Sequence, residues 1–358
     1  MTALPPPSAD AVNVVVCDDS ALVRAALTRI LEREPGISVV ARVGDGRFAV
    51  AEVARRRSGA QPVDVVVLDL EMPVMDGMTA LSFLLGADPS VRVLISSTTT
   101  TRGAETALRA LSHGASDYLP KPCAGDGAAG SRFSAELLAK VRGLSRLRRR
   151  ATMKAPERPL QLRPLPPTRV PRLLAIGSST GGPNALFTLM RELLQLPVRV
   201  VLTQHMPPAF TPILAEHITR LGGMPCTEAQ DHEILAPGRI YLAPGDRHLL
   251  VHAVAGNLQA RLSNEPAENY CRPSVDPMMR SAAAACPGQV LAVMLTGMGR
   301  DGLAGARCVV EGGGMALAQD EATCVVWGMP GAIARAGLCH AVLPLGELGG
   351  KIRDLLLR

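Results

Sequence analysis

Two stretches of this 358-residue chain alternate short apolar runs with amphipathic helical segments, and a proline-rich stretch separates them. In the first stretch, five such pairs fall within about 135 residues, which predicts a doubly wound parallel sheet. The stretch between them, residues 151–171, holds six prolines and little periodicity, so we expect a semi-rigid linker. The alternation restarts at Arg172, so we expect a second α/β domain, which also has a doubly wound parallel sheet.

The domain boundaries follow from these changes in pattern. We expect a disordered N-terminus over 1–11, a first domain over 12–150, a linker over 151–171 and a second domain over 172–358. The first domain should have strands at 12–16, 39–43, 63–68, 91–95 and 117–119, with a last helix from 134 to about 150. The second should have strands at 173–176, 198–202, 290–295, 316–318 and 324–326.

The net charge of +6 is concentrated in residues 142–150, RGLSRLRRR. A solvated helix end or linker explains this run; nucleic acid or an acidic partner is the alternative, although no aromatic residues are interleaved there. The eight cysteines form no CxxC pair, which favours buried reduced thiols over disulfides or zinc. No signal peptide or membrane-spanning apolar run is present, so we expect a cytoplasmic protein without direct membrane insertion.

Polar residues follow the apolar runs of the first domain. Asp18 and Asp19 follow the first run, Asp69 the third, Ser96 closes the fourth, and Lys121 follows the fifth. Because the carboxyl ends of parallel strands meet at one edge of a sheet, these side chains should lie together. Clustered carboxylates suit Mg²⁺, and a lysine opposite them would neutralise an incoming phosphoryl group. Taken alone, Asp19 could be only a helix N-cap.

These residues lie in the motifs CDDS (17–20), VVVLDLEMPVMDG (65–77), LISS (94–97) and YLPKP (118–122). The set resembles the receiver domain of two-component response regulators over roughly residues 12–150, which implies a flavodoxin-like fold. The resemblance implies that Asp69 accepts phosphate from a histidine kinase and that Asp18, Asp19 and Asp69 bind Mg²⁺. It also implies that Ser96, Tyr118 and Lys121 relay the resulting change.

A second group of polar residues follows apolar runs of the second domain. The turn GSSTGG (177–182) places Ser179 at a strand-to-helix elbow, although such a turn could equally cradle a phosphate. His205 follows the next run, and Asp301 lies in a glycine-rich loop after a later one. A serine nucleophile needs a base, and the base needs an orienting carboxylate. Asp276 is a further acidic candidate, for a substrate-side or structural role.

The stretches that surround these residues are IGSSTGG (176–182), TQHMPP (203–208), YLAPGDRH (241–248), RPSVD (272–276), LTGMGRDG (295–302) and QDEATCVVWGMP (319–330). With the receiver in front, the chain resembles CheB-type protein-glutamate methylesterases of chemotaxis-like pathways. The resemblance implies that Ser179 is the nucleophile, His205 the general base and acid, and Asp301 the orienting carboxylate. Backbone N–H groups near Thr180 and Met298 would then stabilise the oxyanion.

The family resemblance also implies a substrate and a mode of control. The substrates would be glutamyl methyl esters, and also glutamines, of a methyl-accepting chemoreceptor. Ester hydrolysis would need no cofactor, whereas receiver phosphorylation would need Mg²⁺. The unphosphorylated receiver would cover the Ser179 rim, and phosphorylation of Asp69 would release it. Two alternatives are a DNA-binding response regulator, which lacks support because no helix-turn-helix pattern occurs, and an inert docking scaffold.

Overall fold

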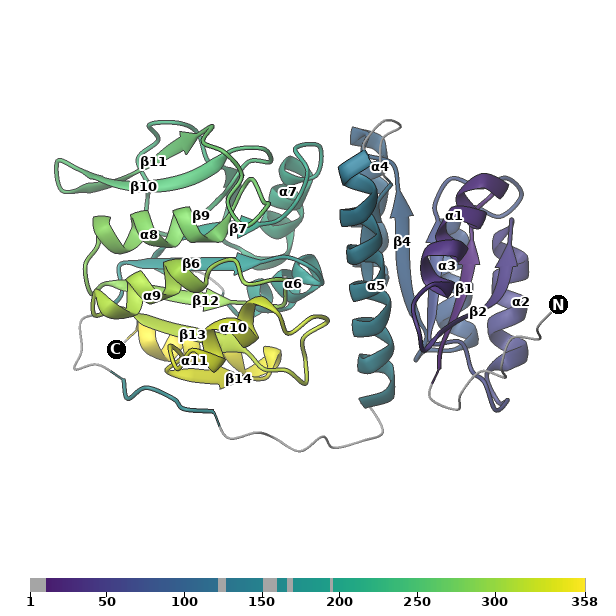
Figure 1. Cartoon of the computed structure of the whole chain (residues 1–358). Coiled ribbons are helices and arrows are strands. Elements are labelled where there is room, and N and C mark those ends of the chain that lie inside the picture. The colour runs from purple at the N-terminus through teal and green to yellow at the C-terminus, as the bar shows by residue number, and fades with distance from the viewer. Residues whose placement is uncertain (1–10, 122–126, 151–159, 166–169, 194–195, 358) are drawn as a thin grey trace. The chain divides into compact units, whose positions relative to one another are not determined.

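The computed structural model describes residues 11–121, 127–150, 160–165, 170–193 and 196–357. The chain divides into two compact units, Met1–Lys154 and Ala155–Arg358 (Figure 1). The N-terminus that we expected to be disordered lies outside the described residues except for Ala11, as does most of the predicted linker. The described part of that linker belongs to the second unit, because Leu160 packs against its core and the Arg163 N–H donates to the Cys339 carbonyl at 2.8 Å.

The first unit is built on a five-stranded sheet, as the alternation predicts. Its strands are β1 (Val12–Cys17), β2 (Ile37–Val43), β3 (Val65–Asp69), β4 (Arg92–Ser97) and β5 (Asp117–Pro120). Its helices are α1 (Ala21–Glu32), α2 (Gly46–Arg56), α3 (Gly77–Ala87), α4 (Thr101–Ser112) and α5 (Gly127–Arg150). The order β2-β1-β3-β4-β5 is parallel throughout. Every residue of β3 is buried, which is typical of a central strand covered on both faces.

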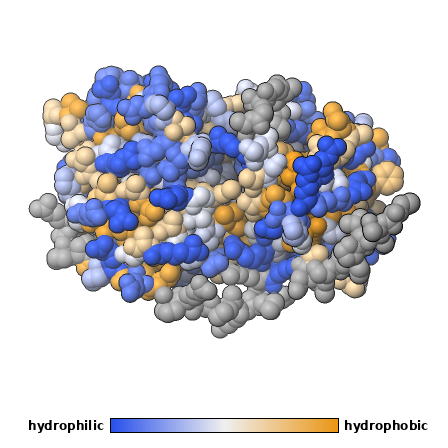
Figure 2. All heavy atoms as spheres, in the orientation of Figure 1, coloured by the Kyte–Doolittle hydropathy of each residue, from blue (hydrophilic) through white to orange (hydrophobic). Residues whose placement is uncertain are grey.

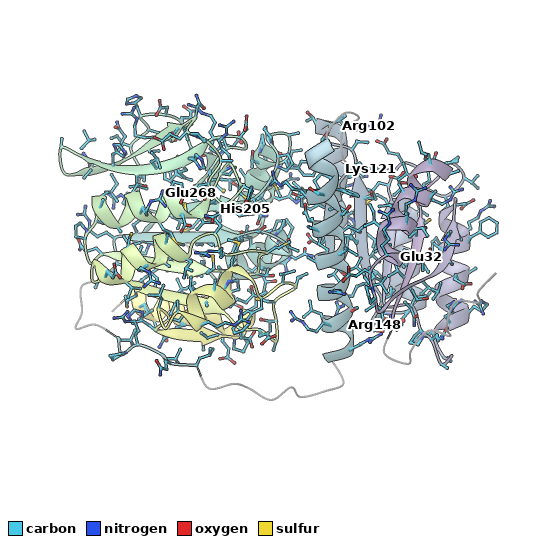
Figure 3. The ribbon with its side chains drawn as sticks, in the orientation of Figure 1. Glu32, Arg102, Lys121, Arg148, His205 and Glu268 are labelled. Atoms are coloured by element: carbon cyan, nitrogen blue, oxygen red, sulfur yellow. The ribbon has the colours of Figure 1, made fainter. Side chains whose placement is uncertain are left out.

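The basic run forms the end of α5 and pairs with acidic residues of the same unit. Arg148 lies 2.9 Å from Asp88, and Arg149 lies 3.0 Å from Asp64 (Arg148 is labelled in Figure 3). Both carboxylates are buried, so these pairs fasten the helix end to the sheet. The run is therefore a helix end, as the simpler of the two explanations has it, but it is packed and not solvated, since the Arg148 side chain is only 10% exposed.

The second unit has a seven-stranded parallel sheet and a separate hairpin. Its strands are β6 (Leu173–Ser178), β7 (Arg199–Gln204), β8 (Cys226–Glu228), β9 (Arg239–Leu242), β10 (His248–Val254), β11 (Asn257–Ser263), β12 (Val290–Met294), β13 (Met315–Gln319) and β14 (Ala341–Leu343). Its helices are α6 (Gly182–Glu192), α7 (Thr211–Gly222), α8 (Val275–Ala285), α9 (Leu303–Glu311), α10 (Met329–Arg335) and α11 (Leu345–Leu356). The sheet order is β14-β13-β12-β6-β7-β9-β8. This arrangement confirms the predicted doubly wound class.

The antiparallel hairpin β10–β11 lies over α8, which lies between the hairpin and the sheet (Figure 1). Leu249, Val251, Leu258 and Ala260 point into the core, whereas mainly hydrophilic residues cover the hairpin on the face shown in Figure 2. This alternation is expected of an antiparallel pair with one wet face. None of the helices in the described ranges is long and apolar enough to cross a membrane.

One predicted strand is wrong. Residues 324–326 form a loop, although their apolar composition favours a strand. The Thr296 hydroxyl accepts the Val326 N–H at 3.0 Å, and the Val326 carbonyl accepts the Gly297 N–H at 3.0 Å. The segment therefore satisfies its backbone polar groups against the loop after β12, and needs no place in the sheet.

Candidate active site

The sheet of the second unit has a topological switch point between β6 and β12. From β6 the chain continues outward through β7 on one side, and it returns through β12 on the other. Ligand sites of open parallel sheets form in the crevice at such a point. Ser179 directly follows β6, His205 directly follows β7, and Asp301 lies in the loop after β12. The three predicted residues therefore share one edge of the sheet.

His205 and Asp301 form the central pair of this site. The His205 Nε2 lies 2.7 Å from the Asp301 Oδ2, and the carboxylate is almost completely buried. Five further donors surround that carboxylate: the N–H groups of Val275, Asp276 and Gly302, the Ser274 hydroxyl and the Asn269 amide. Burial raises the pKa of Asp301, but the hydrogen bonds and the charge of His205 outweigh it and lower the pKa to about 2. The carboxylate is therefore ionised at neutral pH.

The other ring nitrogen of His205 faces a thiol. Its Nδ1 lies 3.3 Å from the Cys271 Sγ. Burial lowers the pKa of His205, but the hydrogen bonds and charges of Asp301 and Cys271 raise it to about 10. Because the Asp301 carboxylate can only accept, it favours a proton on Nε2, and Nδ1 is the nitrogen that can exchange a proton with the group that faces it.

The two consecutive serines have different environments. Ser178 is fully buried and donates to the Gln204 Oε1 at 2.7 Å. The Gln204 amide donates in turn to the carbonyls of Ser179 and His205, at 3.0 Å each. Ser178 therefore supports the backbone that carries the other two residues. Ser179 is partly exposed, which leaves it as the serine that a substrate can reach.

Ser179 is close to the β12 loop but is not paired with His205. Its N–H donates to the Thr296 carbonyl at 3.0 Å, and a Cβ on Gly297 would lie 2.9 Å from the Ser179 Cβ. Glycine at 297 thus permits this close approach. Within the described ranges, no hydrogen bond joins the Ser179 hydroxyl to His205. In this conformation the His205 Nδ1 contacts Cys271 instead.

The predicted oxyanion donors come from two segments close to Ser179. Thr180 is buried at the entry to α6, and Met298 is 40% exposed in the glycine-rich loop after β12. Neither backbone N–H donates to a protein acceptor among the residues that the structure describes.

Several residues of the site escaped the sequence reasoning. Asn269, Cys271 and Ser274 lie in or beside the RPSVD stretch, yet nothing in the local pattern sets them apart. Asp276, the further acidic candidate, accepts the Gly305 N–H at 2.6 Å and the Asn269 amide at 2.9 Å. Burial raises its pKa, and the Gly305 hydrogen bond opposes that rise. Its contacts are structural.

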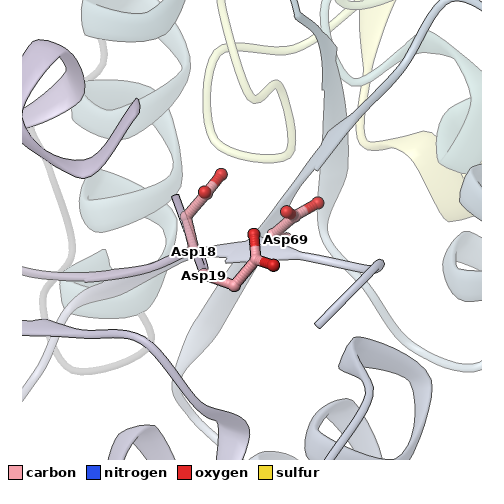
Figure 4. Close-up of side chains that lie close together, drawn as sticks. All are labelled: Asp18, Asp19 and Asp69. Atoms are coloured by element: carbon pink, nitrogen blue, oxygen red, sulfur yellow. The ribbon is translucent and has the colours of Figure 1, made fainter. Parts of the chain in front are cut away.

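The first unit places its predicted residues at the corresponding point of its own sheet, between β1 and β3. One oxygen from each of Asp18, Asp19 and Asp69 lies within 4.8 Å of the others (Figure 4). The Lys121 Nζ lies 2.9 Å from both the Asp18 and the Asp69 Oδ2. Three convergent carboxylates are the hard oxygen donors that Mg²⁺ prefers, so the residues fit this ion. Burial raises the pKa of Asp69, despite the hydrogen bond and charge of Lys121.

The two remaining receiver residues are both buried. Ser96 stands opposite Asp69 in the β3–β4 register, and its hydroxyl has no hydrogen-bond partner within the described part of the chain. Tyr118 is turned inward, with the Lys140 Nζ 5.3 Å from its ring centroid. That ammonium also forms a buried ion pair with Asp117 at 2.7 Å. The buried Ser96 hydroxyl is thus a polar group near Asp69 that has no partner among the described residues.

Known proteins match both units. The model of the CheB methylesterase family matches residues 174–352, and that of the response regulator receiver domain matches 14–127. A protein-glutamate methylesterase/protein-glutamine glutaminase of Paramagnetospirillum magneticum is 49% identical, over 99% of this chain and 98% of its own length. The chain belongs to the CheB methylesterase family. It is a hydrolase of this family with a receiver domain in front.

Further relatives of this CheB-family hydrolase support the same family assignment. A protein-glutamate methylesterase/protein-glutamine glutaminase of Azospirillum brasilense is 49% identical, over 98% of this chain and 94% of its own length. The crystal structure of the Thermotoga maritima CheB methylesterase catalytic domain matches with a TM-score of 0.51 and 39% identity. It covers 52% of this chain and 98% of its own.

Proposed function

We propose that this CheB-family hydrolase is a phosphorylation-activated protein-glutamate methylesterase. Its substrates are glutamyl methyl esters of a methyl-accepting chemoreceptor, and it also deamidates receptor glutamines. The names of its full-length relatives support this substrate class. The observation that carries the proposal is the 2.7 Å pair of His205 and the buried Asp301 carboxylate, which lies beside a partly exposed serine at the switch point.

The chemistry begins at Ser179. Its hydroxyl attacks the ester carbonyl while His205 takes the proton, and the Thr180 and Met298 N–H groups bind the developing oxyanion. For this step the Ser179 hydroxyl replaces the Cys271 thiol at the His205 Nδ1. Methanol leaves with that proton, and water then releases the acyl group by the same route. Side chains and amides of the chain supply every group that this route uses.

Control resides in the receiver unit. Asp69 accepts the phosphoryl group from a histidine kinase, and Asp18, Asp19 and Asp69 hold Mg²⁺. When bound, the ion neutralises negative charge around Asp69. Lys121 lies 2.9 Å from Asp69 and can bind a phosphoryl oxygen, and the unpaired Ser96 hydroxyl offers a second donor. The unphosphorylated receiver would keep the receptor from Ser179, and phosphorylation would shift the population to an open state.

Methanol release from methylated receptor membranes tests the proposed activity. We expect Ser179→Ala and His205→Gln to lower the rate about 10⁴-fold or more, because a serine hydrolase needs both groups. Ser178→Ala is the matched control, since its hydroxyl contacts Gln204 and not the substrate; it should lose far less. Folding is checked by the cooperativity of urea unfolding. Full activity in a folded Ser179→Ala protein would leave the docking scaffold as the better explanation.

A phosphodonor tests the proposed control. Asp69→Asn in the full-length chain should keep the basal rate and lose all stimulation by a small-molecule phosphodonor with Mg²⁺. The isolated second unit, residues 155–358, should be faster than the unphosphorylated full-length chain. Equal rates for these two proteins would refute inhibition by the receiver without touching the esterase assignment.

A further inference from the structure

A tight turn presents Cys271 to the imidazole of His205. Glu268 and Cys271 exchange backbone hydrogen bonds of 3.1 and 2.9 Å across the turn (Glu268 and His205 are labelled in Figure 3). The two residues between them adopt positive φ angles of 53° and 63° although neither is glycine. Such a conformation persists only where the surroundings hold it.

Two side chains of this turn, Glu268 and Asn269, fasten it to its surroundings. Arg280 of α8 forms two hydrogen bonds with the Glu268 carboxylate, at 2.6 and 2.7 Å. The Asn269 amide donates to both Asp276 and Asp301, at 2.9 and 3.0 Å. The position of Cys271 is therefore fixed by the same carboxylate that orients His205.

The three side chains form a series of thiol, imidazole and carboxylate. The Cys271 Sγ lies 3.3 Å from the His205 Nδ1, and the His205 Nε2 lies 2.7 Å from the Asp301 Oδ2. Asp301 holds the ring by accepting from Nε2, so Nδ1 is the atom that can take the thiol proton. The raised pKa of His205 agrees with an imidazole that retains such a proton.

The other described cysteines lack these features. Five are buried, and burial raises the pKa of Cys17, Cys226 and Cys339 to about 12. Among the described cysteines, only Cys271 and Cys308 are partly exposed. Cys308 lies on α9, and no histidine hydrogen-bonds to its sulfur among the described residues. It provides a control of similar exposure without the base.

We infer that Cys271 is a reactive thiol, activated by His205 and open to oxidation by hydrogen peroxide. The Cys271 sulfur attacks one peroxide oxygen while its proton passes to His205. The S–O bond forms, the O–O bond breaks, and the departing hydroxide takes the proton back from His205. The products are a cysteine sulfenic acid and one water molecule. The added oxygen would lie at Nδ1, where the proposed mechanism needs the Ser179 hydroxyl; this consequence rests on the proposed function.

Thiol labelling of the full-length protein tests the inference without reference to activity. The protein is treated with limiting hydrogen peroxide and dimedone, or with iodoacetamide, and each cysteine peptide is quantified by mass spectrometry. We expect Cys271 to react about tenfold faster than Cys308, because the His205 Nδ1, 3.3 Å from the Cys271 Sγ, can take the thiol proton as the sulfur attacks. His205→Asn should reduce the Cys271 rate to that of Cys308. Equal labelling rates for Cys271 and Cys308 in the wild-type protein, or a Cys271 rate that His205→Asn does not change, would overturn the inference.

Two controls keep this experiment decisive. Cys308→Ser should leave the Cys271 rate unchanged. The buried Cys17 and Cys324 report on folding, because a variant that stays folded leaves both unlabelled. A His205→Asn protein that labels them is unfolded; His205→Gln, judged by the same criterion, then replaces it.

Receptor demethylation links the modification to the active site. Peroxide should abolish methanol release by the wild-type protein, and dithiothreitol should restore it. Cys271→Ala, compared with its own untreated rate, should resist peroxide. Fast Cys271 labelling in a protein that releases no methanol before treatment would reject the proposed function and keep the reactive thiol. Normal methanol release with slow Cys271 labelling would reject the reactive thiol and keep the proposed function.

Discussion

The two units of this chain place their reactive groups at the same point of the same kind of sheet, but they treat the central carboxylate in opposite ways. Asp69 lies at the switch point of β1 and β3, and Asp301 lies beyond β12 at the switch point of β6 and β12. Five donors besides His205 surround Asp301, and its pKa falls to about 2. Asp69 accepts one backbone N–H, at 3.4 Å, and shares Lys121 with Asp18, and burial raises its pKa.

The difference follows from what each carboxylate is proposed to do. A carboxylate that orients a histidine must stay ionised and fixed, so it is surrounded by donors. A carboxylate that attacks a phosphoryl group is more reactive when few donors stabilise its charge. The unpaired Ser96 hydroxyl belongs to the same incomplete environment. Donor supply, and not position in the sheet, therefore separates an orienting carboxylate from a nucleophilic one.

The largest expected effect tests whether Asp301 is the orienting group. Asp301→Asn should lower kcat/KM for receptor methyl esters about 10³- to 10⁴-fold, because an amide cannot hold the imidazole tautomer. Asp276→Asn is the matched control, a neighbouring buried carboxylate that contacts Gly305 and Asn269 but not His205. It should lose less than about tenfold. Equal losses would mean that the two carboxylates act together.

Acid unfolding of the second unit should expose the low pKa of Asp301. Its pKa falls from 3.8 to about 2 on folding, so the stability it contributes is present above pH 3.8 and is lost as the pH falls through 2. The loss should be on the order of 2 kcal/mol, measured by urea unfolding at a series of pH values. Asp301→Asn should flatten this dependence; an unchanged slope would show that other carboxylates dominate it.

Asp69 should change the stability of its unit with pH in the opposite direction to Asp301. Its raised pKa means that its ionised form costs stability at neutral pH, and that this cost disappears as the pH falls below 3.8. Asp69→Asn should therefore stabilise the first unit at pH 7. Thermal unfolding of both proteins at pH 7 and pH 3.5 measures the difference. Destabilisation at pH 7 would show that the ionised carboxylate stabilises the fold through Lys121.

The smallest expected effect concerns Ser96. Because its buried hydroxyl lacks a partner, Ser96→Ala should cost no stability and could add up to about 1 kcal/mol. The same change should reduce phosphodonor stimulation of methanol release while the basal rate holds. Ser97→Ala is the control. The Ser97 hydroxyl donates to the Gly103 carbonyl at 2.8 Å, so its removal should lower the free energy of unfolding. A stabilised Ser96→Ala protein with full stimulation would remove Ser96 from the proposed relay.

The sequence alone determined the two α/β units and which residues stand at their strand ends. Apolar runs are local features, and parallel strands bring their carboxyl ends to one edge whatever the loops do. The sequence therefore places Asp18 and Asp69 at one edge of the first sheet. In the same way it places Ser179 and His205 at one edge of the second. The wrong prediction of a strand at 324–326 shows the limit of sequence periodicity, because a loop can satisfy the backbone hydrogen bonds of an apolar run equally well.

The pairing of the side chains at each edge depends on tertiary packing. His205 contacts Cys271, 66 residues away, and Asp301, 96 residues away. Ser178 and Ser179 are adjacent in sequence, yet one is buried against Gln204 and the other is partly exposed. Such pairings depend on the paths of loops and on the packing around each rotamer, which join residues distant in the chain. Sequence periodicity predicts which edge a residue reaches, but only packing sets the atom that it faces.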